Sequence, residues 1–184
     1  MVPILARAAA LALACGSAAC AAPAAEAPQA KAEAIQPIIR GGCRQGQCRW
    51  LRVQSSESAD PIEQGQLRKV VVRSGTSHHP DDNVPREPPR KGIEWEDRDQ
   101  TYYAFCSIHR PAFAFPDESG GYVVHFLDLY DLAGYQSASA DTYMRICHAL
   151  DEVPEPEILR TIGYRPGTRS EQVEAADPQV MTRF

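Results

Sequence analysis

The sequence predicts a small α+β domain, with an antiparallel sheet of four or five strands, one main helix packed on one face, and disulfide bonds. Short segments rich in β-branched and aromatic residues recur between residues 50 and 129. One later segment, residues 137–150, carries apolar residues at helical spacing. Four of the six cysteines lie beyond residue 21, and an even count in an exported chain is typical of a disulfide framework. The length of 184 residues leaves room for one ordinary domain.

Residues 1–21 have the layout of a secretory signal peptide. Arg7 precedes an Ala/Leu run, and Ala19-Cys20-Ala21 resembles a cleavage site with small residues. The run from Ala8 to Ala22 is shorter than the roughly 20 residues needed to span a bilayer, so we expect it to be removed. A disordered Ala/Pro-rich N-terminus is the alternative.

The segment Gly16-Ser17-Ala18-Ala19-Cys20 resembles a permissive bacterial lipobox, in which the cysteine becomes the lipid-bearing first residue. It lacks the leucine that such boxes usually carry three residues before the cysteine. Cys20 is therefore the lipidation candidate, and Cys15 is a second one closer to Arg7. We favour secretion or periplasmic release over a lipid anchor in the outer membrane, and we expect contact with a membrane only through such an anchor.

Residues 22–37 form an Ala/Pro-rich segment that we interpret as a tether. A single globular domain is expected over residues 38–164, followed by a disordered tail over 165–184. Within the domain, Trp50–Val53 and Leu67–Arg73 predict two strands that pair in an antiparallel manner.

Residues 74–100 are polar and contain four prolines, which disfavour a continuous helix or a central strand. We therefore expect a long polar loop here. Loops of this length in a compact domain are usually either functional or disordered.

Three further strands are expected over 101–108, 112–115 and 122–129, with a turn over 117–121. If that turn pairs Phe115 with Tyr122, strand alternation places one set of apolar side chains on a common face: Phe113, Phe115, Tyr122, Val124 and Phe126.

A helix is expected to begin at Ser137 or Ser139 and to end before Pro154. Its buried stripe consists of Ala140, Tyr143, Met144, Cys147 and Leu150. A short second helix is expected over 156–162, ending at Gly163.

Four cysteines allow three pairings, and we predict Cys43 with Cys48 and Cys106 with Cys147. The first pair flanks a four-residue segment with a central glycine, and the second joins the aromatic strand to the helix. Cys106-x2-His109 and the adjacent Cys147-His148 also suggest a zinc site, and Cys106 with His125 or His148 suggests a nucleophilic cysteine–histidine pair. An extended strand sends positions 106 and 109 to opposite faces, which favours the disulfide.

The segment Ser77-His78-His79-Pro80-Asp81-Asp82 holds the metal-site candidates His78, His79, Asp81 and Asp82. Imidazoles and carboxylates ligate transition metals. Adjacent histidines on an extended chain point apart, so we favour no deliberate site, and no cofactor is predicted. Asp128 and Asp131 are interpreted as turn residues, with paired catalytic carboxylates as the alternative.

The net charge of −5 and scattered basic residues disfavour a nucleic-acid partner. The sequence carries no Gly-rich phosphate loop, G-x-S-x-G or H-E-x-x-H motif, so we predict no catalytic residue. The expected function is that of an exported bacterial envelope or secreted protein, a non-enzymatic domain that binds an unidentified protein or envelope partner. The alternatives are a small metal-dependent hydrolase using His78 and His79, and a structural lipoprotein.

Overall fold

The computed structural model describes residues 38–80 and 83–183, which all belong to one compact unit of the chain. The predicted signal peptide over 1–21, Cys20 and the tether over 22–37 lie outside the described residues. The metal-site candidates Asp81 and Asp82 do so as well.

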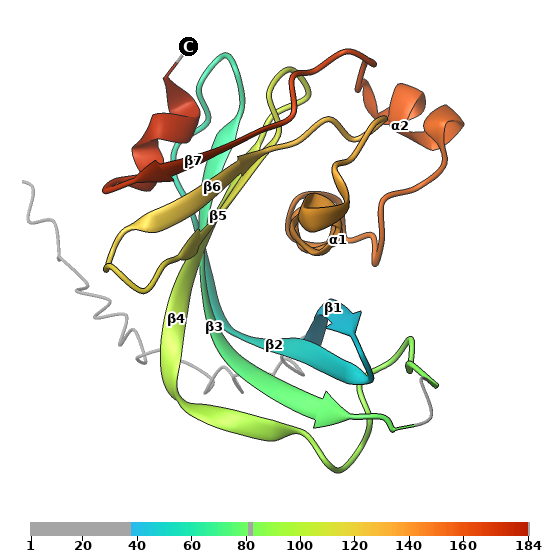
Figure 1. Cartoon of the computed structure of the whole chain (residues 1–184). Coiled ribbons are helices and arrows are strands. Elements are labelled where there is room, and N and C mark those ends of the chain that lie inside the picture. Colours follow the sequence, from blue (N-terminus) through green and yellow to red (C-terminus); the bar gives the residue numbers. More distant parts are fainter. Residues whose placement is uncertain (1–37, 81–82, 184) are drawn as a thin grey trace, which may run out of the picture. The chain divides into compact units, whose positions relative to one another are not determined.

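Seven antiparallel strands form one sheet in which each strand pairs with its neighbours in sequence. The sheet curls into a half-barrel around the main helix (Figure 1). The strands are β1 (Ile38–Arg44), β2 (Gln47–Ser58), β3 (Gln66–His78), β4 (Glu94–Cys106), β5 (Ala112–Pro116), β6 (Tyr122–Phe126) and β7 (Glu171–Ala175). The helices are α1 (Ser137–His148) and α2 (Pro156–Ile162), with short 3-10 turns η1 (Gly134–Gln136) and η2 (Pro178–Thr182).

This architecture corrects the predicted fold class, because the unit is mostly sheet, with seven strands and two short helices where four or five strands and one main helix were expected. The edge strands β1 and β7 were missed because their sequences, IIRGGCR and EQVEA, lack a sustained apolar alternation. The long loop was overestimated for a similar reason: β3 continues to His78 and β4 begins at Glu94. The first residues of β4 are charged and mostly exposed, so their sequence resembles that of a loop.

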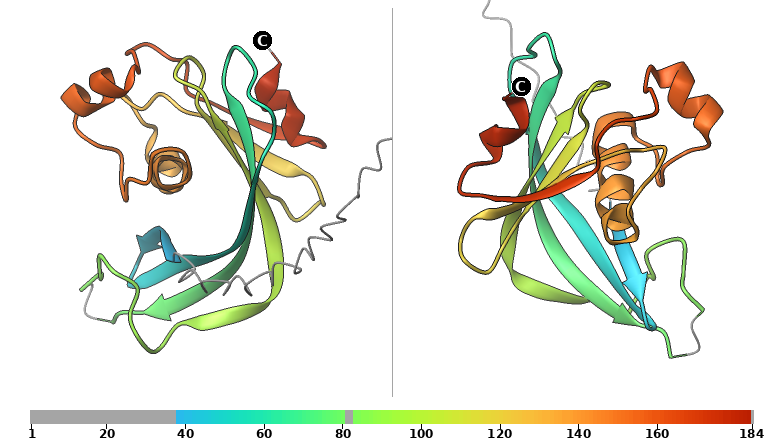
Figure 2. Two further views of the ribbon diagram at one scale, coloured as in Figure 1. Left: turned by 180° about the vertical axis from the view of Figure 1, so that it is seen from behind. Right: turned by 45° about the horizontal axis from the view of Figure 1, so that its top comes forward.

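Residues 165–183 also differ from the expected disordered tail. They contain β7, which pairs with β6, and η2, whose Met181 is fully buried. Asp177 begins η2 as its N-terminal cap, since its carboxylate accepts the backbone N–H of Gln179 at 2.9 Å. Figure 2 shows η2 on the opposite side of the sheet from α1.

The curl of the sheet follows from irregularities in its long strands. The pairing register shifts between Arg40 and Cys43 on β1, between Val53 and Ser55 on β2, and between Arg73 and Gly75 on β3. Such bulges bend a strand and increase its twist. At Gly75, an added Cβ would lie 2.7 Å from the Trp95 ring, so glycine is needed where the Trp95 side chain of the neighbouring strand packs against β3.

Two apolar clusters cover the two faces of the sheet. The concave face packs against α1 through a cluster that includes Ile39, Leu51, Val70, Val72, Tyr102, Phe113, Tyr143 and Met144. The convex face packs against η2 through Phe105, Ala112, Ala114, Val124, Phe126 and Met181.

The predicted pairing of Phe115 with Tyr122 is wrong by one residue. Phe115 pairs with Val123, and Tyr122 pairs with Pro116. A shift of one residue exchanges the faces of a strand. Phe113 and Phe115 therefore pack on the concave side, whereas Tyr122, Val124 and Phe126 pack on the convex side.

Both predicted helices are present. In α1, Ala140, Tyr143 and Met144 of the expected stripe are fully buried. The helix ends at Ala149 in the left-handed conformation, and α2 ends at Gly163 as expected. Among the described residues, no helix has the length and apolar character needed to cross a membrane.

Candidate functional site

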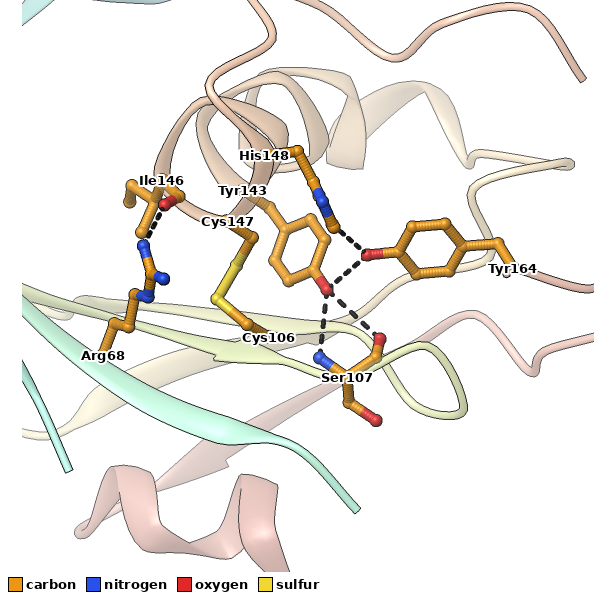
Figure 3. Close-up of a disulfide and its surroundings, with 8 residues drawn as sticks. All are labelled: Arg68, Cys106, Ser107, Tyr143, Ile146, Cys147, His148 and Tyr164. Carbon is orange, nitrogen blue, oxygen red and sulfur yellow. Dashed lines mark hydrogen bonds between the residues drawn. A yellow bond between two sulfur atoms is a disulfide. The ribbon is translucent and has the colours of Figure 1, made fainter. Parts of the chain in front are cut away.

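The two predicted cysteine pairs are confirmed. Cys43 and Cys48 are directly opposite on β1 and β2, with their Cα atoms 4.0 Å apart. Gln45 and Gly46 form the tight turn between them, and both have positive φ, as a two-residue hairpin turn requires. Cys106 on β4 is bonded to Cys147 on α1 with a Cα separation of 5.5 Å, so the helix is covalently tied to the sheet (Figure 3).

Beside the second disulfide lies a buried chain of hydrogen bonds, here called the tyrosine–histidine chain (Figure 3). The Tyr143 hydroxyl is 3.2 Å from both the backbone N–H and the carbonyl oxygen of Ser107. It also lies 2.8 Å from the Tyr164 hydroxyl, which is 2.6 Å from His148 Nε2. The chain thus joins β4, α1 and the segment after α2.

One direction of donation satisfies every contact in this chain. Nε2–H of neutral His148 donates to Tyr164, Tyr164 donates to Tyr143, and Tyr143 donates to the Ser107 carbonyl while accepting the Ser107 N–H. Burial lowers the pKa of His148, with nearby Arg68 acting in the same direction. Burial raises the pKa of Tyr143 well above its usual value and that of Tyr164 to about 12. All three groups therefore stay neutral at neutral pH, which suits a structural network.

The Cys106-x2-His109 spacing does not form a metal-binding or nucleophilic pair. Cys106 is held in the disulfide, and His109 is exposed. Ser107 Oγ accepts the N–H groups of His109 and Arg110 at 3.2 and 3.1 Å, which forms the turn before Pro111.

His78 and His79 separate as the extended chain predicts. His78 ends β3 and is exposed. His79 Nε2 lies 2.8 Å from Ser77 Oγ, and that oxygen accepts the indole N–H of buried Trp50 at 2.8 Å. The His79 ring thereby extends a hydrogen-bonded group that includes Ser77 and Trp50. Among the described residues no three His, Cys, Asp or Glu side chains gather closely enough to hold a metal ion.

Asp128 behaves as a turn residue. Its carboxylate accepts the N–H of Tyr130 at 3.0 Å, and its carbonyl accepts the N–H of Asp131 at 3.2 Å. This geometry is that of an Asx-type turn.

A cleft of about 1190 Å³ lies between β1, β2 and the start of α1, and it is here called the outer cleft. The residues that line it are mostly polar: Arg40, Gly41, Gly42, Cys43, Arg44, Gln47, Arg49, Thr76, Val84, Glu96, Gly134, Tyr135, Ser137, Ala138 and Asp141. Three arginines gather here although the chain as a whole is acidic. Arg40 lies close enough to Asp141 to oppose the increase in the pKa of that carboxyl that burial causes.

A smaller cavity of about 150 Å³, the inner pocket, lies between the concave sheet face and α1. Its walls are largely apolar or aromatic: Gly41, Arg49, Leu51, Tyr102, Phe113, Phe115, His125, Tyr135, Ala138, Ser139 and Thr142. The two cavities share Gly41, Arg49, Tyr135 and Ala138, so the inner pocket lies directly behind the outer cleft. Charged side chains border the outer cleft and aromatic side chains border the inner pocket, and aromatic walls with a few polar groups are typical of small-molecule sites.

His125 forms part of the wall of the inner pocket. Its Nδ1 lies 2.8 Å from Ser139 Oγ, and its Nε2 lies 3.0 Å from the amide oxygen of Gln172. An amide oxygen only accepts, so Nε2 carries the proton and Ser139 donates to Nδ1. Burial lowers the pKa of His125, and the bond to Gln172 opposes this effect. His125 is thus a buried histidine with both ring nitrogens paired, and its contacts connect β6, α1 and β7.

Sequence reasoning missed both cavities. The one available signal was Gly41-Gly42 within β1, since glycine in a strand often marks a bulge or a close approach. At Gly42, an added Cβ would lie 2.9 Å from that of Ala138, so β1 approaches α1 closely here. No sequence pattern around Arg49 or Tyr135 indicates a site, because the two residues are far apart in the sequence and only the curl of the sheet brings them together.

Comparison of the chain with family models, with curated proteins and with solved structures finds no match. The interpretation of the site therefore rests on the geometry described above.

Proposed function

We propose that this protein is an exported, disulfide-stabilised domain that binds a small ligand in the outer cleft and inner pocket. The observation that carries the proposal is that the outer cleft of about 1190 Å³ and the inner pocket of about 150 Å³ share lining residues, and that aromatic side chains surround the inner pocket. The rest of the concave face is packed against α1.

Binding without catalysis agrees best with the polar groups of the inner pocket. His125 and Ser139 are paired with each other and with Gln172, and Thr142 donates to the Ala138 carbonyl at 2.8 Å. These groups stabilise the fold around the pocket.

Ligand-observed NMR with a library of neutral and charged small compounds tests this proposal. Thr142 lines the inner pocket and is 2% exposed, so the larger side chain of Thr142→Leu reduces the volume of the pocket. We expect compounds that bind the wild-type chain to bind this variant more weakly. Binding that is unchanged in Thr142→Leu, or no binding at all, would contradict the proposal.

Export is supported by the layout of residues 1–21 and by the two disulfides, which persist in oxidising compartments. Intact mass of the chain isolated from a bacterial host tests it, with loss of residues 1–21 as the expected result. A lipid-modified Cys20, with membrane association lost in Cys20→Ala, would instead identify a lipoprotein. An unprocessed chain in the cytoplasm would contradict export.

A further inference from the structure

We infer that the ligand is a small amphiphilic anion, whose oxyanion group binds Arg49 while a short apolar or aromatic body fills the inner pocket. The inference rests on the proposed function and adds the chemical class and the orientation of the ligand. It depends on a contrast between Arg49 and the other polar groups around the inner pocket.

The polar side chains deep in the pocket already have protein partners. His125 bonds with Ser139 and Gln172, and Thr142 bonds within α1. The Tyr102 hydroxyl donates to the Gln100 amide oxygen at 3.1 Å. The side-chain donors of these residues are all used within the protein, so an apolar body suits the inner pocket best.

Arg49 differs from these groups. Its guanidinium has five N–H donors, of which Nη2 makes one long bond to Ser74 Oγ at 3.3 Å. Among the ion pairs of the described residues, none includes Arg49. The side chain is exposed to the cleft and lines both cavities. It therefore retains donors for a ligand where the outer cleft adjoins the inner pocket.

The geometry of β1 gives Arg49 this position. An added Cβ at Gly41 would lie 3.4 Å from Arg49 Cγ, so the aliphatic stem of the arginine packs over a residue that has no side chain. Guanidinium groups bind carboxylates and phosphates through paired N–H donors. Arg44 also lines the cleft and adds positive charge, whereas Arg40 lies near enough to the Asp141 carboxyl to lower its pKa against the effect of burial.

The size of the inner pocket limits the body of the ligand. A cavity of about 150 Å³ lined by apolar side chains accommodates a group the size of benzene. Tyr135 is 59% exposed and packs edge-on to His125 at 5.5 Å between ring centroids, so its ring forms the rim of the inner pocket. A longer ligand would extend past this rim into the outer cleft.

Isothermal titration of the full chain, with both disulfides formed, tests the inference with four probes: benzoate, phenyl phosphate, benzamide and acetate. Benzoate and benzamide have nearly the same shape and differ in charge, whereas acetate lacks the ring. We expect benzoate or phenyl phosphate to bind at least about tenfold more tightly than benzamide, and acetate to bind more weakly than benzoate. The better of the two anions identifies the oxyanion.

Arg49→Gln should remove the preference for the charged probes and leave benzamide binding unchanged. Arg52→Gln is the matched control, because Arg52 lies on the same strand but on the convex side, with its guanidinium 4.0 Å from the centre of the Trp95 ring. It makes the same change in charge and should leave all four affinities unchanged.

The outcomes separate this inference from the proposed function. Equal binding of benzoate and benzamide, unchanged in Arg49→Gln but weakened in Thr142→Leu, would overturn the anionic ligand and leave the cavity as a binding site. If Arg52→Gln lost as much benzoate affinity as Arg49→Gln, the preference for anions would come from the overall charge of the protein. That result would also overturn the inference. Absence of binding by every probe at millimolar concentration, in the wild-type chain and in all variants, would overturn both proposals.

Discussion

The two ends of the concave sheet face differ in how they pack against α1. At the closed end, α1 is bonded to β4 through Cys106 and Cys147, and the tyrosine–histidine chain fills the space beside the disulfide with paired hydroxyls. At the open end, β1 and the start of α1 leave the outer cleft and the inner pocket. The same helix thus fixes the fold with its last turn and borders a cavity with its first.

This difference separates the residues that we expect to stabilise the fold from those that we propose to bind the ligand. At the closed end, burial favours the neutral forms of Tyr143, His148 and Tyr164. The open end has three arginines, and Arg49 keeps most of its donors for a ligand. We therefore expect substitutions at the closed end to lower the free energy of unfolding, and substitutions at the open end to change binding.

Removal of the Cys106–Cys147 disulfide should have the largest effect. Its cysteines are 41 residues apart, and loop-closure entropy predicts a loss of about 4 kcal/mol in the free energy of unfolding for the double alanine variant. The Cys43–Cys48 pair closes a loop with a separation of 5, and its loss should cost about 2 kcal/mol. Urea denaturation measures both. Equal losses, or a larger one for the hairpin pair, would contradict the view that the closed end holds the unit together.

Alkaline pH should weaken the closed end next. The pKa of Tyr164 is raised to about 12 in the folded state, and an unfolded tyrosine titrates near 10. Stability is therefore fully present below pH 10 and is lost as the pH rises from 10 through 12, by about 3 kcal/mol for this group. Denaturant midpoints measured across this range test the sign. Tyr164→Phe should make stability depend less on pH in this range. An equally steep loss of stability in that variant would show that another group causes the effect.

Tyr143→Phe should lower the free energy of unfolding by about 2 kcal/mol, because the Ser107 N–H and carbonyl lose their side-chain partner in a buried place. Tyr135→Phe is the matched control at the open end, where the side chain is 59% exposed, and it should change stability by less than about 0.5 kcal/mol. Thermal unfolding monitored by circular dichroism provides the comparison. Similar values for the two variants would remove the distinction between the ends.

Arg49→Gln should have the smallest effect and change the free energy of unfolding by no more than about 0.5 kcal/mol. Among the described contacts, it removes one long hydrogen bond, to Ser74 Oγ. The same chemical denaturation experiment measures it. A loss of about 2 kcal/mol or more would give Arg49 a structural role and weaken its assignment to a ligand.

The closed end could be predicted from the sequence, because its parts are local or periodic. The stripe on α1 and the cysteine count led to the disulfide pairs, and Gly163 marked the end of α2. The partners Tyr164 and Ser107 could not be found in this way, because they meet Tyr143 only through the packing of separate segments.

The open end could not be predicted, since it depends on strands that sequence patterns do not reveal. β1 and β7 are edge strands with glycine or charged residues, and the bulges that curl the sheet produce no periodic pattern in the sequence. The one-residue error between β5 and β6 shows the same limit. The turn over 117–121 is closed by Asp117, whose carboxylate accepts the N–H groups of Ser119 and Gly121, and these local bonds set the register.

The most direct test of the account is a titration of the full chain with benzoate, followed through the backbone amide resonances in two-dimensional NMR spectra. We predict that the resonances of Gly41, Gly42, Arg49 and Ala138 shift in a saturable manner, whereas those of Ser107 and Tyr164 stay in place. Saturable shifts centred on the closed end or on His78 and His79, with the resonances of the open end unchanged, would contradict the claim that the outer cleft and the inner pocket form the binding site.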